Sequence, residues 1–413
     1  MAKGKITKEQ ELLLYVLKRA VKGVKDDFFD FDLSDVDWKS FINESFFQAV
    51  SYITFENSVL LKPYVPEELY KKWTGRIVSV VVSNVSVVNA QKNLISMIGE
   101  NRKYLILKGL SSASYYPNPE LRDLGDVDFL IADNEQEEVK NILIENGYEC
   151  RGEGNDHHTI FRKPTEILEM HFEINGVPQG VKGEKVRSFM AGALGDGKKT
   201  TLGSDLIGEF FAPDKMRQGL ILILHMQHHM LYGGLGLRHL LDWAYYINKT
   251  EGEPFWQELL AFFKEIGIFV YAATMTKTCS LYLGSDCPKW CEDVPDSLCE
   301  EVMLDILSLG NFGHRDINRS KSGLLIYNHG EEGVAGGTKG RLWQQFKISV
   351  KSRHKSLEKH KILFPFFCVW EFFRYSFEAI CGKKPKIKKL LKDAKDRKSV
   401  YEKLHVFESE QTE

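Results

Sequence analysis

Two aspartates separated by one residue, Asp126 and Asp128, form the pattern in this sequence that is best suited to chemistry. Side chains two apart on a β-strand point to the same face, so on a strand these carboxylates would lie side by side while Val127 and Phe129 turn into a core. Two neighbouring anions repel each other, and a hard divalent cation such as Mg2+ neutralises them. Mg2+ also binds substrate phosphates, and paired ions can stabilise the attacking and leaving oxygens of a phosphoryl displacement. The pair therefore predicts a metal-assisted phosphate site.

A glycine-containing turn before the aspartate pair is suited to contact the phosphates. Gly109 follows the apolar run 104–107, and a backbone without a Cβ atom can come close to a phosphate group. Lys108 and Arg122 lie nearby in the sequence as countercharges, and we expect Arg122 to contact a phosphate.

A third acid is expected on a later strand, at 166–174. There the apolar residues alternate with charged or polar ones, so that a carboxylate, an imidazole and a second carboxylate share one face: Glu169, His171 and Glu173. For His171 two interpretations stay open, a half-buried structural histidine or a group that orients Glu169 or a phosphate.

These motifs, taken together, resemble a known family. A Gly/Ser turn after a strand, an Asp-x-Asp pair on the next strand and a further acid on a later one are similar to the nucleotidyltransferase fold shared with DNA polymerase beta. The pattern Leu-Lys-Gly at 107–109, Tyr-Pro-x-Pro-x-Leu-Arg at 116–122, Gly-Asp-Val-Asp at 125–128 and acid-x-His at 169–171 resembles one branch most, the bacterial uncharacterised nucleotidyltransferases. The resemblance covers most of the chain and is best from 105 to about 248.

The sequence departs from the family pattern in two places. Leu110 follows Gly109, which displaces the usual serine to Ser111 and Ser112. A turn-rich insert at 114–120 also lengthens the spacing to Asp126.

The resemblance implies both a fold and an activity. The fold would be α+β, with a polymerase beta-like nucleotidyltransferase core, a small mixed sheet with helices, flanked by N-terminal and C-terminal helical regions. The activity would be transfer of a nucleotidyl group, which we expect to be adenylyl from ATP, from an NTP to an unknown acceptor, with release of pyrophosphate.

Roles for individual residues follow from the same resemblance. Asp126 and Asp128 would hold the metal, Mg2+ or Mn2+. Glu169 matches the third acid and would complete a second metal position, with Glu173 in reserve, and His171 matches the family's histidine. The nucleotide would be bound by Lys108, Gly109, Ser111, Ser112 and Arg122.

A group of polar residues in the helical half is expected to line the acceptor pocket. An almost wholly apolar helix beginning near Pro213 carries His225, His228 and His229 and breaks at Gly233 and Gly234. A second amphipathic helix, at 237–247, places Arg238 and Asp242 one turn apart, where they can form an ion pair. We expect these five residues, with His171, to face a cleft between core and helices; a metal site at His225 and His229 is the weaker interpretation, because no nearby acid completes a zinc-protease motif.

Three regions are expected along the chain: an N-terminal helical region (1–100), the nucleotidyltransferase core (101–205) and a C-terminal helical domain with a basic tail (206–413). Helices are predicted at 6–21, 38–52, 77–88 and 135–145, and strands at 104–107, 126–131, 157–162 and 166–174. The stretch 330–340 is glycine-rich and predicts a loop.

Composition indicates a globular, cytoplasmic protein. The 413 residues are 43% hydrophobic, which is ample for a core, and seven cysteines argue against a disulfide framework. No apolar run is long enough to span a bilayer. The net charge of −2 gives no strong nucleic-acid signal, although the basic, aromatic tail at 347–398 leaves an anionic or RNA partner open.

Two alternatives to the transferase interpretation remain at this stage. One is a non-catalytic nucleotide-binding or partner-binding protein that keeps the fold. The other is a toxin-like transferase acting on tRNA or protein, although we favour a small-molecule acceptor.

Overall fold

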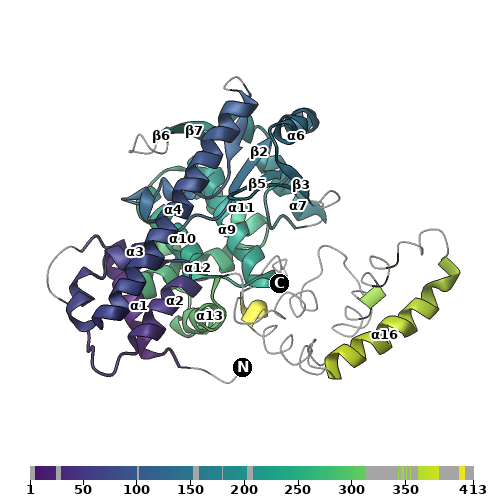
Figure 1. Cartoon of the computed structure of the whole chain (residues 1–413). Coiled ribbons are helices and arrows are strands. Elements are labelled where there is room, and N and C mark those ends of the chain that lie inside the picture. Colours follow the sequence, from purple (N-terminus) through teal and green to yellow (C-terminus); the bar gives the residue numbers. More distant parts are fainter. Residues whose placement is uncertain are drawn as a thin grey trace.

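The computed structural model describes residues 5–24, 29–99, 102–151, 158–178, 180–201, 208–311, 343, 346–347, 350, 354, 361–380 and 400–404. The chain is mostly helical, with one mixed sheet, as expected for the α+β class (Figure 1). The helices are α1 (Lys8–Val21), α2 (Trp38–Phe47), α3 (Ser51–Glu56), α4 (Glu67–Ile98), α5 (Leu110–Ala113), α6 (Gln136–Glu145), α7 (Gly180–Met190), α8 (Ala193–Asp196), α9 (Lys215–Tyr232), α10 (Leu237–Thr250), α11 (Phe255–Glu265), α12 (Phe269–Leu283), α13 (Asp296–Leu309) and α16 (Phe364–Ile380). Short 3₁₀ helices lie at Val59–Tyr64, Pro119–Leu121, Asp133–Glu135, Lys289–Cys291 and Lys361–Leu363.

The central sheet has five strands in the order β1-β2-β5-β4-β3. Its strands are β1 (Tyr104–Ile106), β2 (Val127–Ile131), β3 (Glu149–Arg151), β4 (His158–Lys163) and β5 (Glu166–His171). β2 and β5 are parallel neighbours and the other pairs are antiparallel, so Asp128 lies directly beside Glu169. A separate two-stranded antiparallel sheet pairs β6 (Lys198–Thr201) with β7 (Glu209–Ala212).

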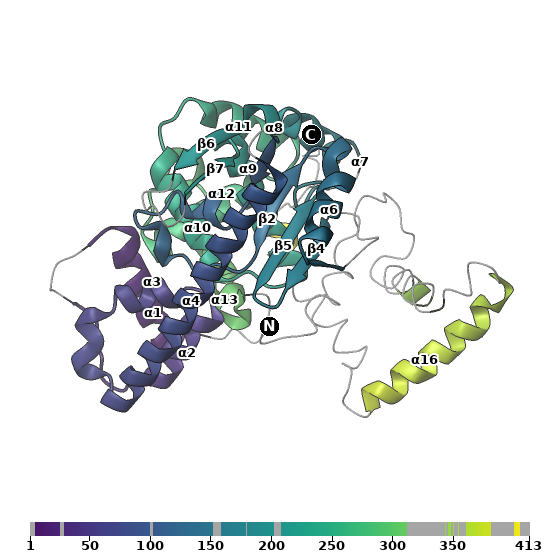
Figure 2. The ribbon, with the colours of Figure 1, turned by 45° about the horizontal axis from the view of Figure 1, so that its top comes forward.

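Alternation along β2 explains how the sheet is covered on both faces. Val127, Phe129 and Ile131 are buried in a cluster with residues of α4 and α6. Leu130, which points the other way, packs instead against the core of the helical half, and so the intervening Asp128 also faces that half. Figure 2 shows α4 and α6 beside strands β2, β5 and β4.

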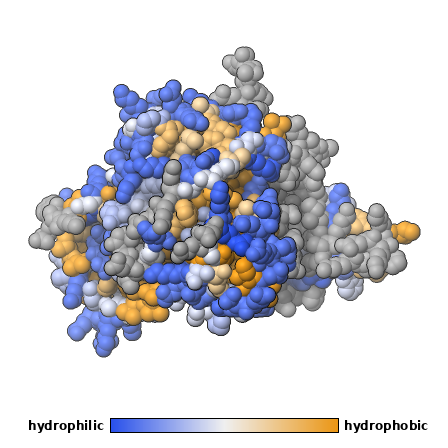
Figure 3. Space-filling model, turned by 90° about the horizontal axis from the view of Figure 1, so that it is seen from above, coloured by the Kyte–Doolittle hydropathy of each residue, from blue (hydrophilic) through white to orange (hydrophobic). Residues whose placement is uncertain are grey.

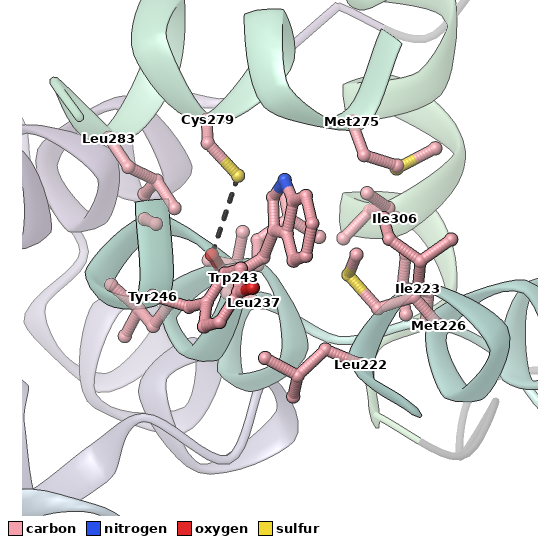
Figure 4. Close-up of a cluster of buried hydrophobic side chains, with 14 of the residues drawn as sticks. Leu222, Ile223, Met226, Leu237, Trp243, Tyr246, Met275, Cys279, Leu283 and Ile306 are labelled. Carbon is pink, nitrogen blue, oxygen red and sulfur yellow. Dashed lines mark hydrogen bonds between the residues drawn. The ribbon is translucent and has the colours of Figure 1, made fainter. Parts of the chain in front are cut away.

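The N-terminal and C-terminal helices share one hydrophobic core. This core includes Leu13 of α1, Leu224 of α9, Trp243 of α10 and Met275 of α12. Trp243 lies between α9 and α12 (Figure 4). It donates a hydrogen bond from Nε1 to Thr276 Oγ1 over 2.8 Å. Nearby, the Cys279 thiol donates to the carbonyl oxygen of Leu240 over 3.4 Å. The helices that share this core, which we call the helical half, therefore form one packed body. It lies against the face of the sheet opposite α6.

Most predicted elements are confirmed, with shifted ends. The serine-spaced stretch 77–88 is helical, inside α4, and the predicted helix at 135–145 ends before Gly147, whose φ is +85°. The predicted helix at 38–52 is wrong as a single element, because Ala49 takes a positive φ of 53° between α2 and α3. The predicted strand 166–174 ends early, at His171, so Glu173 lies outside it. The strands β3, β6 and β7 were not predicted.

Two expectations fall largely outside the described residues. The glycine-rich stretch 330–340 is one, and most of the basic tail at 347–398 is the other, except for α16, which lies apart from the main body in Figure 1. Large apolar side chains are exposed on α16, including Phe366, Trp370 and Phe373. The face of the molecule shown in Figure 3 is mainly hydrophilic, with apolar patches between the polar side chains.

At Gly176 the loop after β5 comes close to the backbone of α9. Its φ is +85°, and an added Cβ would collide with the backbone carbonyl of Leu224. We predict that Gly176→Ala lowers the free energy of unfolding by at least about 2 kcal/mol, from left-handed strain and the steric collision together. Urea unfolding measures this difference.

Gly75→Ala is the matched control, because this glycine is exposed within α4 and an added Cβ meets nothing within 4 Å. Alanine there should raise the free energy of unfolding by up to about 1 kcal/mol. Equal effects of the two substitutions would contradict the close approach at Gly176.

Candidate active site

A cavity of about 200 Å³ lies between the sheet and the helices α9 and α10. The three predicted acids, Asp126, Asp128 and Glu169, all line it. The remaining lining residues are cations, imidazoles and small or polar residues: Lys108, Arg122, Arg238, His158, His225, His228, His229, Gly109, Gly125 and Asn175.

Asp128 is the most enclosed of the three acids, with 3% of its surface exposed. Its Oδ1 is 2.7 Å from Lys108 Nζ and 2.7 Å from His171 Nε2. Burial alone would disfavour the carboxylate, but the Lys108 ammonium and the His171 imidazole outweigh it and lower the pKa of Asp128. Asp128 is thus held ionised inside the protein by a lysine that also faces the cavity.

Glu169 and Asp126 are in the opposite electrostatic situation. Burial and the charges of Asp128 and Asp126 raise the pKa of Glu169 to about 8. Burial and the charge of Asp128 likewise raise the pKa of Asp126. The ligand atoms of Asp128, Glu169 and His171 lie within 4.8 Å of one another. Three acids that oppose one another's ionisation leave this wall of the cavity in need of positive charge.

The turn after β1 places Lys108 and Gly109 in the cavity. Gly109 takes φ +61° and ψ −110°, a combination that side chains with a Cβ rarely adopt, and it precedes the short helix α5. Ser111 and Ser112 are on α5, each 1% exposed, and do not line the cavity. Ser111 Oγ donates to Gln218 Oε1 over 3.2 Å. The glycine turn therefore reaches the site, whereas the two serines lie behind it.

Asp242 pairs with Arg122 rather than with Arg238, so the predicted one-turn ion pair is wrong. Arg122 donates from Nε to Asp242 Oδ1 over 2.8 Å and from Nη2 to Oδ2 over 2.7 Å, and Tyr116 donates to the same Oδ1 over 2.8 Å. Burial opposes the Arg122 charge, but Asp242 outweighs it and raises the pKa of Arg122. A planar guanidinium fits a carboxylate with two parallel bonds, and Arg122 makes both of them. Arg238 instead donates to the carbonyl oxygen of Asp123 over 3.2 Å.

The predicted histidines do gather at the cavity. The turn at Gly233 and Gly234 brings α9 against α10, and the rings of His225 and His229 have their centroids 4.4 Å apart. Burial is the main cause that lowers the pKa of both, so each is neutral near pH 7. His171 is wholly buried behind Asp128, and Asp242 lies within the Arg122 pair; neither lines the cavity.

Three residues near the site were not predicted: His158, Asn175 and His239. His158 Nε2 lies 4.0 Å from Glu169 Oε2, because β4 pairs with β5. Asn175 lies in the loop after β5, next to Gly176, where this loop packs closely against α9. His239, in the first turn of α10, packs on His229 with ring centroids 4.7 Å apart. The reserve acid Glu173 accepts a 2.6 Å bond from Arg187 Nε and does not line the cavity.

Comparison with protein families identifies the class. The model of the uncharacterised nucleotidyltransferases matches residues 34–284. The chain belongs to this family, and it is therefore a transferase enzyme. The match spans α2 through α12 and so includes every lining residue of the cavity.

The comparisons with curated proteins and with solved structures give no match. In the described part of the chain, no helix combines the length and apolar character needed to cross a membrane.

The raised pKa of Glu169 predicts a pH dependence of stability in metal-free protein. The folded state keeps this proton up to about pH 8, whereas the unfolded state releases it near its ordinary value of 4.5. The contribution of Glu169 to the wild-type free energy of unfolding should therefore fall as the pH rises from 4.5 to 8. The Glu169→Gln variant has no proton to lose at this position. Its free energy of unfolding, taken relative to that of the wild type, should therefore rise by at least about 1 kcal/mol over that range.

Urea unfolding in the presence of a chelator at several pH values measures this difference. The exposed Glu145→Gln on α6 is the control and should follow the wild-type profile. A Glu169→Gln profile parallel to that of the wild type would show that the neighbouring acids do not oppose Glu169.

Proposed function

We propose that this enzyme transfers a nucleotidyl group, adenylyl from ATP, to a small acceptor and releases pyrophosphate, using a polymerase beta-like core. The observation that carries the proposal is the convergence of Asp126, Asp128 and Glu169 in one cavity. The chain order supports the same core: a glycine turn after β1, an Asp-x-Asp pair at β2 and a third acid on the parallel neighbour β5.

The donor set fits a hard divalent cation. Three carboxylates supply oxygen ligands, the type that Mg2+ and Mn2+ prefer, and their mutual repulsion is what such an ion relieves. One ion would be held by Asp126 and Asp128. A second ion would be held by the same two aspartates together with Glu169. When bound, these ions would neutralise the triphosphate and lower the pKa of an acceptor hydroxyl.

Lys108 is proposed to change partner when the nucleotide binds. Its ammonium group now neutralises Asp128 at 2.7 Å and so supplies the positive charge that a metal ion would supply there. A bound metal would replace that charge, and Lys108 would then be available to a phosphate from the turn that holds Gly109. Ser111 supports this turn from behind through its contact with Gln218, beside the buried Ser112, and Arg122 positions the approach to β2 through Asp242.

The acceptor pocket is proposed on the helical side of the cavity. Arg238, His225, His228 and His229 line that side and offer hydrogen bonds to a hydroxyl, phosphate or amine group. His171 and Asp242 would act from behind, by orienting Asp128 and Arg122.

The proposed organisation follows from these roles. The core at 101–205 supplies the acids and the glycine turn, the helices of 206–413 supply the acceptor wall, and the N-terminal region 1–100 braces both. A cytoplasmic location, expected from the composition, suits an ATP-dependent reaction.

Binding is tested by thermal melts. Mg–ATP should stabilise the wild type by about 2.7 kcal/mol at a concentration 100-fold above its Kd, by mass action on the folded state. The Asp126→Asn, Asp128→Asn double variant should show no stabilisation by Mg–ATP. The control carries the same two changes at exposed aspartates, Asp133→Asn and Asp293→Asn, and should behave as the wild type. Equal shifts in all three proteins would place the nucleotide elsewhere.

Transfer is tested with labelled nucleotides, Mg2+ and a cell extract that contains the acceptor. Label at the α-phosphorus of the preferred NTP should enter a product with the wild type, while label at the γ-phosphorus should be recovered as pyrophosphate. Glu169→Gln should abolish the labelled product. A product labelled from the γ position would indicate phosphoryl rather than nucleotidyl transfer.

A further inference from the structure

Three histidines from two helices converge beside the carboxylate site. His225 and His229 are four residues apart on α9 and so share one face, and His239 is in the first turn of α10. The ring centroids are separated by 4.4 Å for His225 and His229, 4.7 Å for His229 and His239, and 5.3 Å for His225 and His239. One ring nitrogen of each lies within 4.8 Å of the other two.

The chemistry of this cluster differs from that of the acids. Imidazole nitrogen is a borderline-soft ligand that suits zinc, nickel or cobalt, whereas Mg2+ prefers oxygen. His225 Nδ1 is fully buried and has no hydrogen-bond partner, a costly state that a metal ion removes by accepting the nitrogen lone pair. The tight turn at Gly233 and Gly234 also limits how far the two helices can separate, so the three rings stay close with no ion to hold them.

We propose that His225, His229 and His239 bind a zinc-class divalent cation through ligands separate from the three carboxylates, on the wall of the cavity that the proposed function assigns to the acceptor. His225 and His229 line the cavity, while His239, 2% exposed, closes the site from behind. Three protein ligands with one position open toward the cavity are the arrangement of zinc sites that bind water or a substrate oxygen.

Modest side-chain movement completes the site. Nitrogens around a tetrahedral zinc are about 3.3 Å apart, given metal–nitrogen distances of about 2.0–2.1 Å, so the rings must close in by small rotations. His239 Nδ1 now accepts a long 3.4 Å bond from the Gly236 N–H. Coordination through Nε2 requires the proton on Nδ1, so this weak bond would be given up for a metal bond.

The test measures Zn2+ affinity by competition with a chelating dye, and Co2+ binding by visible absorption, on the untagged full chain. All proteins carry Cys287→Ser, because Cys287 Sγ and Cys291 Sγ are 3.8 Å apart and offer zinc a second place. The parent should bind one Zn2+ and show the visible bands of tetrahedral Co2+ without a thiolate charge-transfer band. His239→Asn should weaken Zn2+ binding at least about 100-fold, since even the loss of an outer partner costs about 10–100-fold.

Two controls separate this site from its neighbours. His228→Ala removes the adjacent histidine, which is not in the cluster, and should leave Zn2+ affinity unchanged. The Asp126→Asn, Asp128→Asn variant should also retain it, even where transfer is lost. The proposal is overturned if the folded parent binds no Zn2+ at micromolar concentration, if His239→Asn binds as tightly as the parent, or if loss of the aspartates removes the ion.

Discussion

The structure depends on the placement of two carboxylates in register on adjacent parallel strands. Asp128 on β2 lies beside Glu169 on β5, and both face the helical half rather than open solvent. In that setting their charges cannot coexist without compensation, and the protein supplies part of it through Lys108 and His171. The negative charge that is not compensated in this way acts on Glu169, whose pKa is raised to about 8. The shortfall of positive charge at this wall is the physical basis for metal binding in our account.

A second constraint keeps the helices over that wall. The paired Arg122 and Asp242 are both nearly buried, with 6% and 4% exposure, and they connect the segment before β2 to α10. Removing either partner would leave an unpaired charge inside the protein, which typically costs about 3–5 kcal/mol. The same segment is anchored to α3, since Asp123 accepts bonds from Ser51 and from the Tyr52 backbone N–H. The approach to the aspartate pair is thus held by both helical regions.

Local patterns allowed much of the core to be predicted. The two-residue period of 126–131 and of 166–174 is a property of neighbouring residues. It predicted both strands, placed Asp126 and Asp128 on one face, and left Glu169 and Glu173 as candidates for the third acid. Family resemblance then selected Glu169 over Glu173, and the early end of β5 gives a structural reason for that choice. The histidines on α9 were found for the same reason, because helical spacing and a glycine break are visible along the chain.

Contacts between distant residues could not be predicted in this way. Arg122 and Asp242 are 120 residues apart. The one-turn spacing of Arg238 and Asp242 gave no sign that Asp242 would instead form a two-bond pair with Arg122. His158, Asn175 and His239 belong to none of the predicted motifs and reach the site through strand pairing, loop packing or the helix turn. The burial of Ser111 and Ser112 follows from how α5 packs, which a motif comparison does not contain.

The most direct measurement is a crystal structure of the chain with Mn2+ and a non-hydrolysable ATP analogue. We predict anomalous manganese peaks among Asp126, Asp128 and Glu169, with the triphosphate bound to them and Lys108 Nζ moved from Asp128 to a phosphate. Manganese and nucleotide bound away from these acids, with the 2.7 Å contact between Lys108 and Asp128 unchanged, would contradict it.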